Sequence, residues 1–514
     1  MFHLLFCFLV IAVAGVLPFL YNRISHLFVS SELSSKRSAY ILFFAIIIGF
    51  YSNPLVEGSK YLPQETGILS YSIQFAIKAA YASVLFCFFS FITSLLSTKK
   101  LGLFPVNNHK TCLTISLFSA ISMLILWYCM GTHASFDFHV RQMNQITTGE
   151  YEKAHPIIHT IFCKFLLDIY NSYKTIVIAQ IVLFTIGVYA MCWWCMRAKL
   201  SFLYASITVV AIIFLTYPYI HIIIKDSFFI SSYMIALAGL MAWSLRPDNA
   251  ATFVSAFGLT CVGLFRYDGQ GAVILTAIAL IILCIATRKN IRKILVMVLI
   301  PTLSIFLAHS VLPICVNAKS EMVGTKLAMP AELICEVIAQ NGNLTPEEIT
   351  RVEELIMPRK MILEHHKKGE AYEGQKYIWG GYFRSESEFR KYSFAFNLSG
   401  KGHEIIPLFF KIAAKNPGIV IDHLLMQSKM LWDVAYNRIS STSLAFYLYI
   451  FTLISILERK SLRPFSIPFV PTFSVILTCS LIATTFELRY GLPIIVGSIF
   501  MIGYTNRVRT LHLT

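Results

Sequence analysis

The chain has 514 residues, of which 56% are hydrophobic and only 14% charged, and its formal net charge at pH 7 is +16. This composition excludes an ordinary soluble protein and predicts a polytopic membrane protein. A single soluble core that contained so many apolar residues would bury backbone groups without hydrogen-bond partners. The positive charge does not indicate nucleic-acid binding, since no basic stripe alternates with aromatic residues.

Apolar runs of about 20 residues recur along the chain, and each can cross about 30 Å of hydrocarbon as a helix. We expect about 13 such spans, so the predicted fold class is an all-α polytopic membrane protein. The expected spans are residues 2–21, 39–52, 70–97, 111–130, 175–195, 200–216, 227–245, 250–264, 271–287, 294–312, 445–457, 466–485 and 491–504. Arg23 follows the first span, which favours a retained helix over a cleaved signal peptide.

Lysine and arginine gather in alternate short loops, and such loops stay on the cytoplasmic side, where they can also meet anionic membrane lipid. The basic residues of these loops are Arg23, Lys36, Arg37, Lys99, Lys100, Lys110, Arg197, Lys199, Arg288, Lys289, Arg292, Lys293, Arg459, Lys460, Arg463, Arg507 and Arg509. The distribution predicts a multi-pass protein of a bacterial plasma (inner) membrane, with an external amino terminus and a cytoplasmic carboxyl terminus. The external side then receives residues 131–174, 217–226, 265–270, 313–444 and 486–490.

Three parts follow from this topology. Residues 1–312 form a transmembrane module with the external loop 131–174, residues 313–444 an external soluble domain, and residues 445–514 the carboxyl-terminal transmembrane helices. The external domain is expected to be mostly helical, because Thr345, Pro346 and Glu348 have the spacing of an N-cap, a first-turn proline and a capping box. Amphipathic segments 405–414 and 419–434 predict two further helices.

Most of the 12 cysteines lie in or beside expected spans, where a thiol acts as a small apolar side chain. Cys192 and Cys195 have redox spacing but no thioredoxin-like context, so packing is the favoured interpretation. Cys315 and Cys335 lie in the external segment, and the sequence leaves open whether they pair.

Polar residues in loop 131–174 are the first candidates for a site. Asp137 closely follows a span, where nearby hydrocarbon would raise the pKa of its carboxyl and suit it to act as a base; a helix cap or a solvated acid is the alternative. His155 and His159 are four residues apart and fall on one face of a helix that begins at Pro156. That spacing suits two metal ligands or two donors to an anionic headgroup, although an interfacial histidine bonded to the backbone is commoner.

Charged residues also stand at the external ends of other spans. Lys225 and Asp226 lie against the next span, where a lysine could hold a phosphate and the carboxylate orient an acceptor or a metal; a lysine paired with its neighbour is the alternative. Arg266 and Arg489 depart from the positive-inside pattern, and a guanidinium suits either bidentate phosphate binding or anchoring at the interface. No Walker or dinucleotide motif is present, so no nucleotide cofactor is expected, while a divalent metal stays open.

These motifs resemble the GT-C superfamily of polytopic membrane glycosyltransferases, and within it a bacterial family of unknown function. The resemblance covers most of the chain from residue 131 onward. Its motifs are Asp137 with Gln142 and Gln145, Gly149-Glu150-Tyr151, His155-Pro-Ile-Ile-His159-Thr160, Lys225-Asp226-Ser227, Phe265-Arg266-Tyr267-Asp268-Gly269, Leu344-Thr345-Pro346-Glu347-Glu348 and Arg489-Tyr490.

The resemblance implies hexosyl or pentosyl transfer, with inversion, from a polyprenyl-phosphate-linked donor to a glycan, lipid or protein acceptor at the outer face. Asp137 would be the catalytic base. The donor-phosphate ligands would be Lys225, Arg266 and Arg489, and the residues that orient the acceptor or the site would be Asp226, His155, His159, Gln142 and Tyr490. The chain departs from the family pattern at Asp268, where an asparagine is expected, and it lacks the Asp-x-Asp pair of metal-dependent members.

Two other functions fit a polytopic protein with external polar residues. A polymerase or ligase of lipid-linked polysaccharide would depend on external arginines and not on Asp137. A transporter or flippase would have internal repeats, broken helices and charges near the middle of the bilayer.

Overall fold

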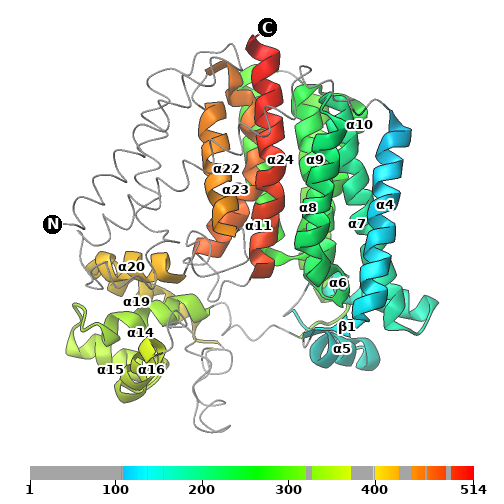
Figure 1. Cartoon of the computed structure of the whole chain (residues 1–514). Coiled ribbons are helices and arrows are strands. Elements are labelled where there is room, and N and C mark those ends of the chain that lie inside the picture. Colours follow the sequence, from blue (N-terminus) through cyan, green and yellow to red (C-terminus); the bar gives the residue numbers. More distant parts are fainter. Residues whose placement is uncertain are drawn as a thin grey trace, which may run out of the picture.

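The computed structural model describes residues 106, 108–135, 137–153, 156–288, 290–319, 327–371, 398, 400–427, 442–457, 460–481 and 488–513. These residues are almost entirely helical, with two short strands. Figure 1 shows a bundle of long helices and a second, smaller group of helices beyond one end of it. The expected spans 2–21, 39–52 and 70–97 lie outside the described residues.

Six helical segments of the described part are long and apolar enough to cross a membrane. They are α4 (His109–Met130), α7 (Tyr173–Arg197), α8 (Phe202–Ile220), α9 (Lys225–Leu245), α11 (Tyr267–Thr287) and the continuous segment of α12 (Ile291–Phe306), the π-helical turn η3 (Leu307–Val311) and α13 (Leu312–Cys315). Shorter apolar stretches lie in α10 (Asn249–Phe265) and α24 (Leu488–Leu513). The protein is therefore a helical membrane protein, while the total of about 13 spans stays a prediction.

Short elements connect the long helices at one end of the bundle. They are β1 (His133–Ala134), the π-helical turn η2 (Asp137–Gln142), α5 (Met143–Thr148), α6 (Ile157–Ile169) and β2 (Ile222–Ile223). In Figure 1 they lie at the lower end, from which α24 rises toward the carboxyl terminus at the top.

One expected span near the carboxyl end is built differently from the prediction. α22 (Thr442–Leu457) and α24 correspond to the expected residues 445–457 and 491–504. Residues 466–485 were expected as one span, but the 3₁₀ helix η5 (Lys460–Phe469) precedes α23 (Val470–Leu481). Pro464 and Pro468 explain the change, because proline donates no backbone hydrogen bond and its ring clashes with the preceding turn of an α-helix.

Helix α9 is the central helix of the bundle, and every residue from 226 to 243 is buried. Two glycines let α10 approach it closely. A Cβ atom on Gly239 would overlap the backbone of Ser255, and one on Gly258 would overlap the backbone of Ala236. The two helices therefore pack backbone against backbone, as helices with small interfacial residues do in membranes.

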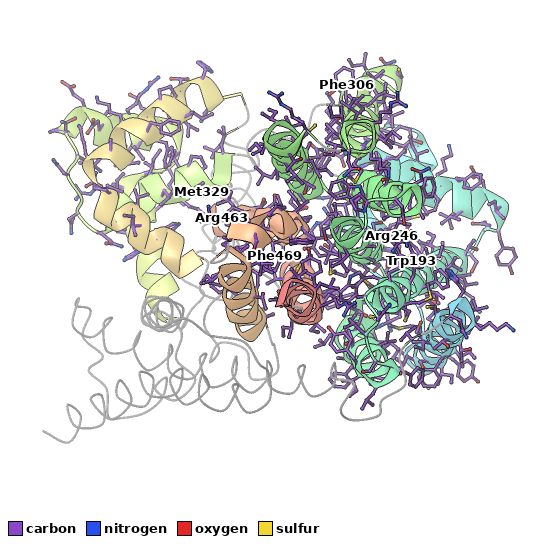
Figure 2. The ribbon with its side chains drawn as sticks, turned by 90° about the horizontal axis from the view of Figure 1, so that it is seen from above. Trp193, Arg246, Phe306, Met329, Arg463 and Phe469 are labelled. Carbon is purple, nitrogen blue, oxygen red and sulfur yellow. The ribbon has the colours of Figure 1, made fainter. Side chains whose placement is uncertain are left out.

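The smaller group of helices has a hydrophobic core of its own, and we call it the helical domain. Its elements are α14 (Ala328–Ala339), α15 (Pro346–Leu355), α16 (Arg359–Ala371), α19 (Gly402–Lys415) and α20 (Pro417–Gln427). The predicted capping box is present: Glu348 N donates to Thr345 Oγ1 (3.2 Å) and Thr345 N donates to Glu348 Oε2 (2.9 Å). In Figure 2, Met329 of this domain lies apart from Trp193 and Arg246 of the bundle.

Several of the described cysteines are buried and pack in the interior, whereas Cys129 and Cys315 are exposed. Cys192 and Cys195 are buried in α7 and both are free. Cys315 is exposed at the end of α13, whereas Cys335 is buried in the core of the helical domain, and both are free. The pairing that the sequence left open is therefore not made.

Candidate functional site

Two connections that are distant in sequence meet at one end of the bundle. Strand β1 pairs in parallel with β2, with His133 opposite Ile222 and Ala134 opposite Ile223. Ser135 N also donates to Ile223 O (3.2 Å). The loop that contains Asp137 and the connection that leads to Lys225 are thus joined at one end of the bundle.

A buried glutamine of α7 holds the connection that leads to Lys225 in place. Gln180 of α7 is fully buried, and its Nε2 donates to Ile222 O (3.1 Å) and to Ile224 O (3.2 Å). Ser227 Oγ donates to Tyr219 O (2.6 Å) across the same connection. These bonds add to those that Ser227 donates to Ile222 O (3.4 Å) and Ile224 O (3.2 Å), and together they hold the start of α9 in position relative to α7 and α8.

Asp137 is the first residue of η2, which runs directly into α5; the sequence predicted an irregular loop there. The next residue, Phe138, is buried and packs edge-on against Tyr173, with 5.8 Å between ring centroids. At the end of the turn, Gln142 is 2% exposed. The side chain of Asp137 lies outside the described part. Single π-helical turns are often found at functional sites, and this one fixes the backbone of the predicted base.

The most strongly charged buried feature is an ion cluster, formed by Asp226, Arg266 and Asp268. Arg266 is 3% exposed; its Nε and Nη2 donate to the two carboxylate oxygens of Asp268 (2.7 and 2.6 Å), and its Nη1 donates to Asp226 Oδ1. The guanidinium carbon lies 4.8 Å from the ring centroid of Phe229. Both acids occupy the first turn of a helix, where the helix dipole favours negative charge.

The ion cluster changes what can be expected of Arg266. The sequence predicted a guanidinium directed at a donor phosphate, whereas three of its N–H groups bind carboxylates. The side of the guanidinium that faces Asp268, whose side chain is 14% exposed, is more accessible than the side that faces Asp226, whose side chain is 2% exposed. The cluster also joins the ends of α9, α10 and α11, and burying these charges would cost several kcal/mol if they were not matched.

Helix α6 begins directly after Pro156, as predicted, and it places His159 inside the protein. His159 is fully buried, with its ring centroid 5.6 Å from that of Phe228 and 6.3 Å from that of Phe265, both in edge-on geometry. Its Nε2 lies 3.8 Å from Cys163 Sγ. His159 is thus packed among aromatic rings, whereas the sequence suggested either a ligand or an interfacial histidine bonded to the backbone. His155 lies outside the described residues.

The remaining predicted residues begin helices at the same end. Lys225 is the first residue of α9, and its side chain is half-buried. Arg489 and Tyr490 lie in the first turn of α24, and their side chains are outside the described part. The structure therefore brings Gln142, Lys225 and the ion cluster to the end of the bundle at which Asp137 and α24 begin.

Other contacts at this end had not been predicted. Tyr267 Oη donates to Lys153 O (2.8 Å), and Lys319 N donates to Tyr151 O (2.8 Å). Lys319 Nζ also pairs with Glu150; the hydrogen bond and its charge lower the pKa of the Glu150 carboxyl and raise that of Lys319. The segment after α5 is thereby attached to α11 and to the chain after α13. Tyr267 directly follows Arg266 in sequence, which is the only signal that could have indicated it.

Within the described ranges, no three His, Cys, Asp or Glu side chains come together as metal ligands. The two buried carboxylates of the site are arranged around the guanidinium of Arg266 instead. The described residues thus offer a fixed charge cluster and not a ready donor set for a divalent ion.

Comparisons of the chain with protein-family models, with curated proteins and with solved structures find no match. The function is therefore inferred from these residues and from the short motifs in the sequence.

Proposed function

We propose that this protein is a membrane glycosyltransferase that moves a sugar from a polyprenyl-phosphate donor to a cell-envelope acceptor. The observation that supports the proposal is the meeting of the Asp137 loop with the buried ion cluster at one end of the bundle. Ionisable groups buried at the ends of membrane helices are costly and usually functional. The motifs that resemble GT-C enzymes in the membrane part all begin or end helices at this same end.

In the proposed reaction, Asp137 accepts the proton of an acceptor hydroxyl as its oxygen attacks the anomeric carbon, which inverts the configuration. The bond between the sugar and the lipid phosphate breaks, and the phosphate leaves with the electron pair. Lys225 and Arg489 stabilise the charge on that phosphate. Gln142, His155 and Tyr490 orient the acceptor.

In this proposal, the main role of the ion cluster is to hold neighbouring residues in position. Arg266 holds Asp226, the neighbour of Lys225, so it determines where the first turn of α9 lies relative to the Asp137 loop. Any contact of Arg266 with the donor phosphate would be made on the more accessible side of the guanidinium, beside Asp268. His159 supports the same region from within the aromatic cluster of Phe228 and Phe265.

The proposal puts this end of the bundle at the outer face of a bacterial plasma membrane. Arg197, Arg288, Arg292 and Lys293 lie at the opposite ends of their helices, and basic loops stay in the cytoplasm. The helical domain lies beyond the proposed outer end (Figure 1), where it can select the acceptor.

The position of the charges favours surface chemistry over transport. A transport path needs polar groups near the middle of the bilayer, whereas Asp226, Arg266 and Asp268 stand at helix ends. A polymerase or ligase of lipid-linked glycans would use the same end, but it would depend on the arginines and not on Asp137.

The test is transfer of labelled sugar from polyprenyl-phosphate donors by the purified protein in lipid. Asp137→Asn should lower transfer by about 100-fold or more, because proton removal by a positioned base contributes at least that much. Asp168→Asn, at an exposed carboxylate of α6, is the matched control and should leave transfer unchanged. Equal transfer by wild type and Asp137→Asn would reject Asp137 as the base, and no transfer from any donor would reject the enzyme class.

A further inference from the structure

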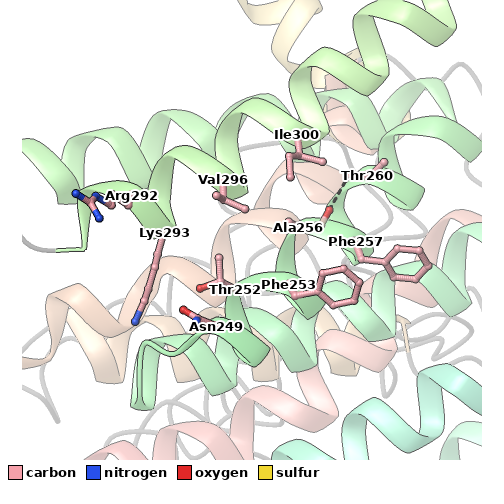
Figure 3. A pocket seen from close by; sticks show the side chains of 10 residues that line it. All are labelled: Asn249, Thr252, Phe253, Ala256, Phe257, Thr260, Arg292, Lys293, Val296 and Ile300. Atoms are coloured by element: carbon pink, nitrogen blue, oxygen red, sulfur yellow. Dashed lines mark hydrogen bonds between the residues drawn. The ribbon is translucent and has the colours of Figure 1, made fainter.

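A groove of about 480 Å³ runs between α10 and α12 (Figure 3), and its polar end lies at the end of the bundle opposite to the ion cluster. Asn249 and Arg292 mark one end of it, close to the beginning of each helix. Arg266 follows the last residue of α10, so the length of this helix, about 25 Å, separates the groove's polar end from the ion cluster. The groove is thus a separate feature of the bundle.

The groove is polar at one end and apolar along the rest of its length. Figure 3 shows Phe253 and Phe257 on α10, facing the same side as Val296 and Ile300 on α12. The two phenylalanine rings stack with centroids 6.2 Å apart, and Phe253 is 69% exposed. The hydroxyls of Thr252 and Thr260 donate to carbonyls of their own helix, so they add little polarity to the surface.

The polar end of the groove has a net positive charge. Arg292 is exposed, and Lys293 Nζ donates to Pro247 O (2.7 Å), which holds the ammonium at the groove. Asp248, the acid directly before Asn249, is paired with Arg197 on the neighbouring helix. Its charge is therefore largely compensated, and the charges of Arg292 and Lys293 determine the potential at this end.

We propose that this groove binds one anionic phospholipid of the bilayer. Its phosphate binds Arg292 and Lys293, and an acyl chain lies along Phe253, Phe257 and Ile300. A lipid is the proposed occupant because the apolar part is formed by exposed hydrophobic residues of two apolar helices, α10 and α12, and in a bilayer such residues face lipid. The guanidinium fork matches phosphate oxygens, and basic residues at a span end attract anionic headgroups. The site is independent of the proposed sugar transfer.

Native mass spectrometry of the purified, delipidated full-length chain tests the proposal, with phosphatidylglycerol and phosphatidylcholine titrated separately. The wild type should bind one phosphatidylglycerol more tightly than phosphatidylcholine. Arg292→Gln should weaken binding of phosphatidylglycerol by about tenfold and that of phosphatidylcholine by less, because the choline ammonium of the second lipid already offsets the charge of its phosphate. Arg288→Gln, four residues away and outside the groove, is the control and should have no effect.

Two further measurements test the apolar part of the groove and distinguish a lipid site from a phosphate site. Val296→Trp places an indole in the apolar part and should weaken binding of both lipids, with unchanged thermal unfolding because Val296 is exposed. Soluble glycerol phosphate should not compete with phosphatidylglycerol; competition would replace the lipid site with a phosphate site. Equal binding of the two lipids, or equal losses in Arg292→Gln and Arg288→Gln, would overturn the proposal, since either result means a non-specific contact.

Discussion

Asp226 and Arg266 stand 40 residues apart in the sequence and form a buried ion pair where α9, α10 and α11 meet. Asp268 binds the other edge of the same guanidinium, so one arginine is shared by two carboxylates. This pairing joins three helix ends next to the β1 and β2 strands. The charged group that the motifs indicated as a ligand is thus also a structural centre of the site.

Removing the arginine should damage the protein more than removing either acid. Arg266→Gln leaves two buried carboxylates without their shared cation, so we expect a loss of about 3–5 kcal/mol in the free energy of unfolding. Asp268→Asn should cost only about 1–2 kcal/mol, because Asp226 still balances the guanidinium and the amide oxygen still accepts a hydrogen bond. Denaturant unfolding in one detergent measures both.

A partly exposed ion pair at the other end of the bundle serves as the control for Arg266→Gln. Arg197 and Asp248 have side chains 17% and 33% exposed, so Arg197→Gln should cost about 1 kcal/mol or less. Equal losses for Arg197→Gln and Arg266→Gln would contradict a structural role of the ion cluster.

Replacing Gln180 should loosen the start of α9. Gln180→Met removes the side-chain hydrogen bonds to the carbonyls of Ile222 and Ile224, and the loss of two such bonds costs about 1–3 kcal/mol. If the protein transfers sugar, kcat should fall by about tenfold with an unchanged pH profile, because Lys225 moves while the base stays. The sugar-transfer assay described above, run at several donor concentrations, separates kcat from KM.

Thr185→Val on the same helix is the control for Gln180→Met. The Thr185 hydroxyl donates to Ile181 O within its own helix, so its loss leaves the second connection unchanged. A drop in kcat of equal size in Thr185→Val would mean that α7 acts through general stability and not through Gln180.

Features that depend on local sequence were predicted well. Hydropathy predicted a span at residues 227–245, and α9 extends over Lys225–Leu245. The agreement is close because a helix that crosses a membrane must be long and apolar, whichever helices pack against it. The capping box of Thr345 and Glu348 also formed as predicted, since all its partners lie within one helical turn. The charged residues were expected on one face, and their pairing was not, because Asp226 and Arg266 meet only through the way α9 and α10 cross.

Features that depend on tertiary neighbours could not be predicted in the same way. The spacing of His155 and His159 does not distinguish ligands from structural histidines, and only the rings of Phe228 and Phe265 show that His159 is packed inside the protein. The turn η2 has no distinctive sequence, because a π-helical turn differs from its neighbours only in hydrogen bonding. Gln180 looked like an ordinary residue of an apolar span, although a buried amide requires hydrogen-bond partners.

The close packing of α9 and α10 predicts a strong effect of one methyl group. Gly258→Ala puts a Cβ atom into the backbone of Ala236, so the helices must separate, at a cost of about 1–3 kcal/mol. Gly418→Ala in α20 is the control, because an added Cβ there meets nothing within 4 Å, and alanine favours the helix. Thermal unfolding should therefore shift down in the first variant and stay level or rise in the second; a shift of the same sign and size in both would reject the close contact.

Acid should destabilise the helical domain through His423. This side chain is 1% exposed, and burial lowers its pKa from 6.5 to about 4, although the negative charge of Glu336 acts in the opposite direction. Because the folded pKa is the lower one, the unfolded chain binds the proton first as the pH falls. Stability from this histidine is therefore complete above about pH 6.5 and declines steadily toward about pH 4.

The part of the acid-induced loss of stability that comes from His423 should be absent in His423→Leu, whose buried side chain does not titrate. Thermal unfolding of the full-length protein at pH 7.5 and at pH 5 measures it, and the difference between the two pH values should be smaller in His423→Leu than in wild type. His403→Leu, at an exposed histidine of α19, should keep the wild-type difference. If His423→Leu and the wild type lost the same stability between the two pH values, the acid sensitivity would have to come from carboxylates such as Glu336, which pairs with His366, and not from the buried imidazole.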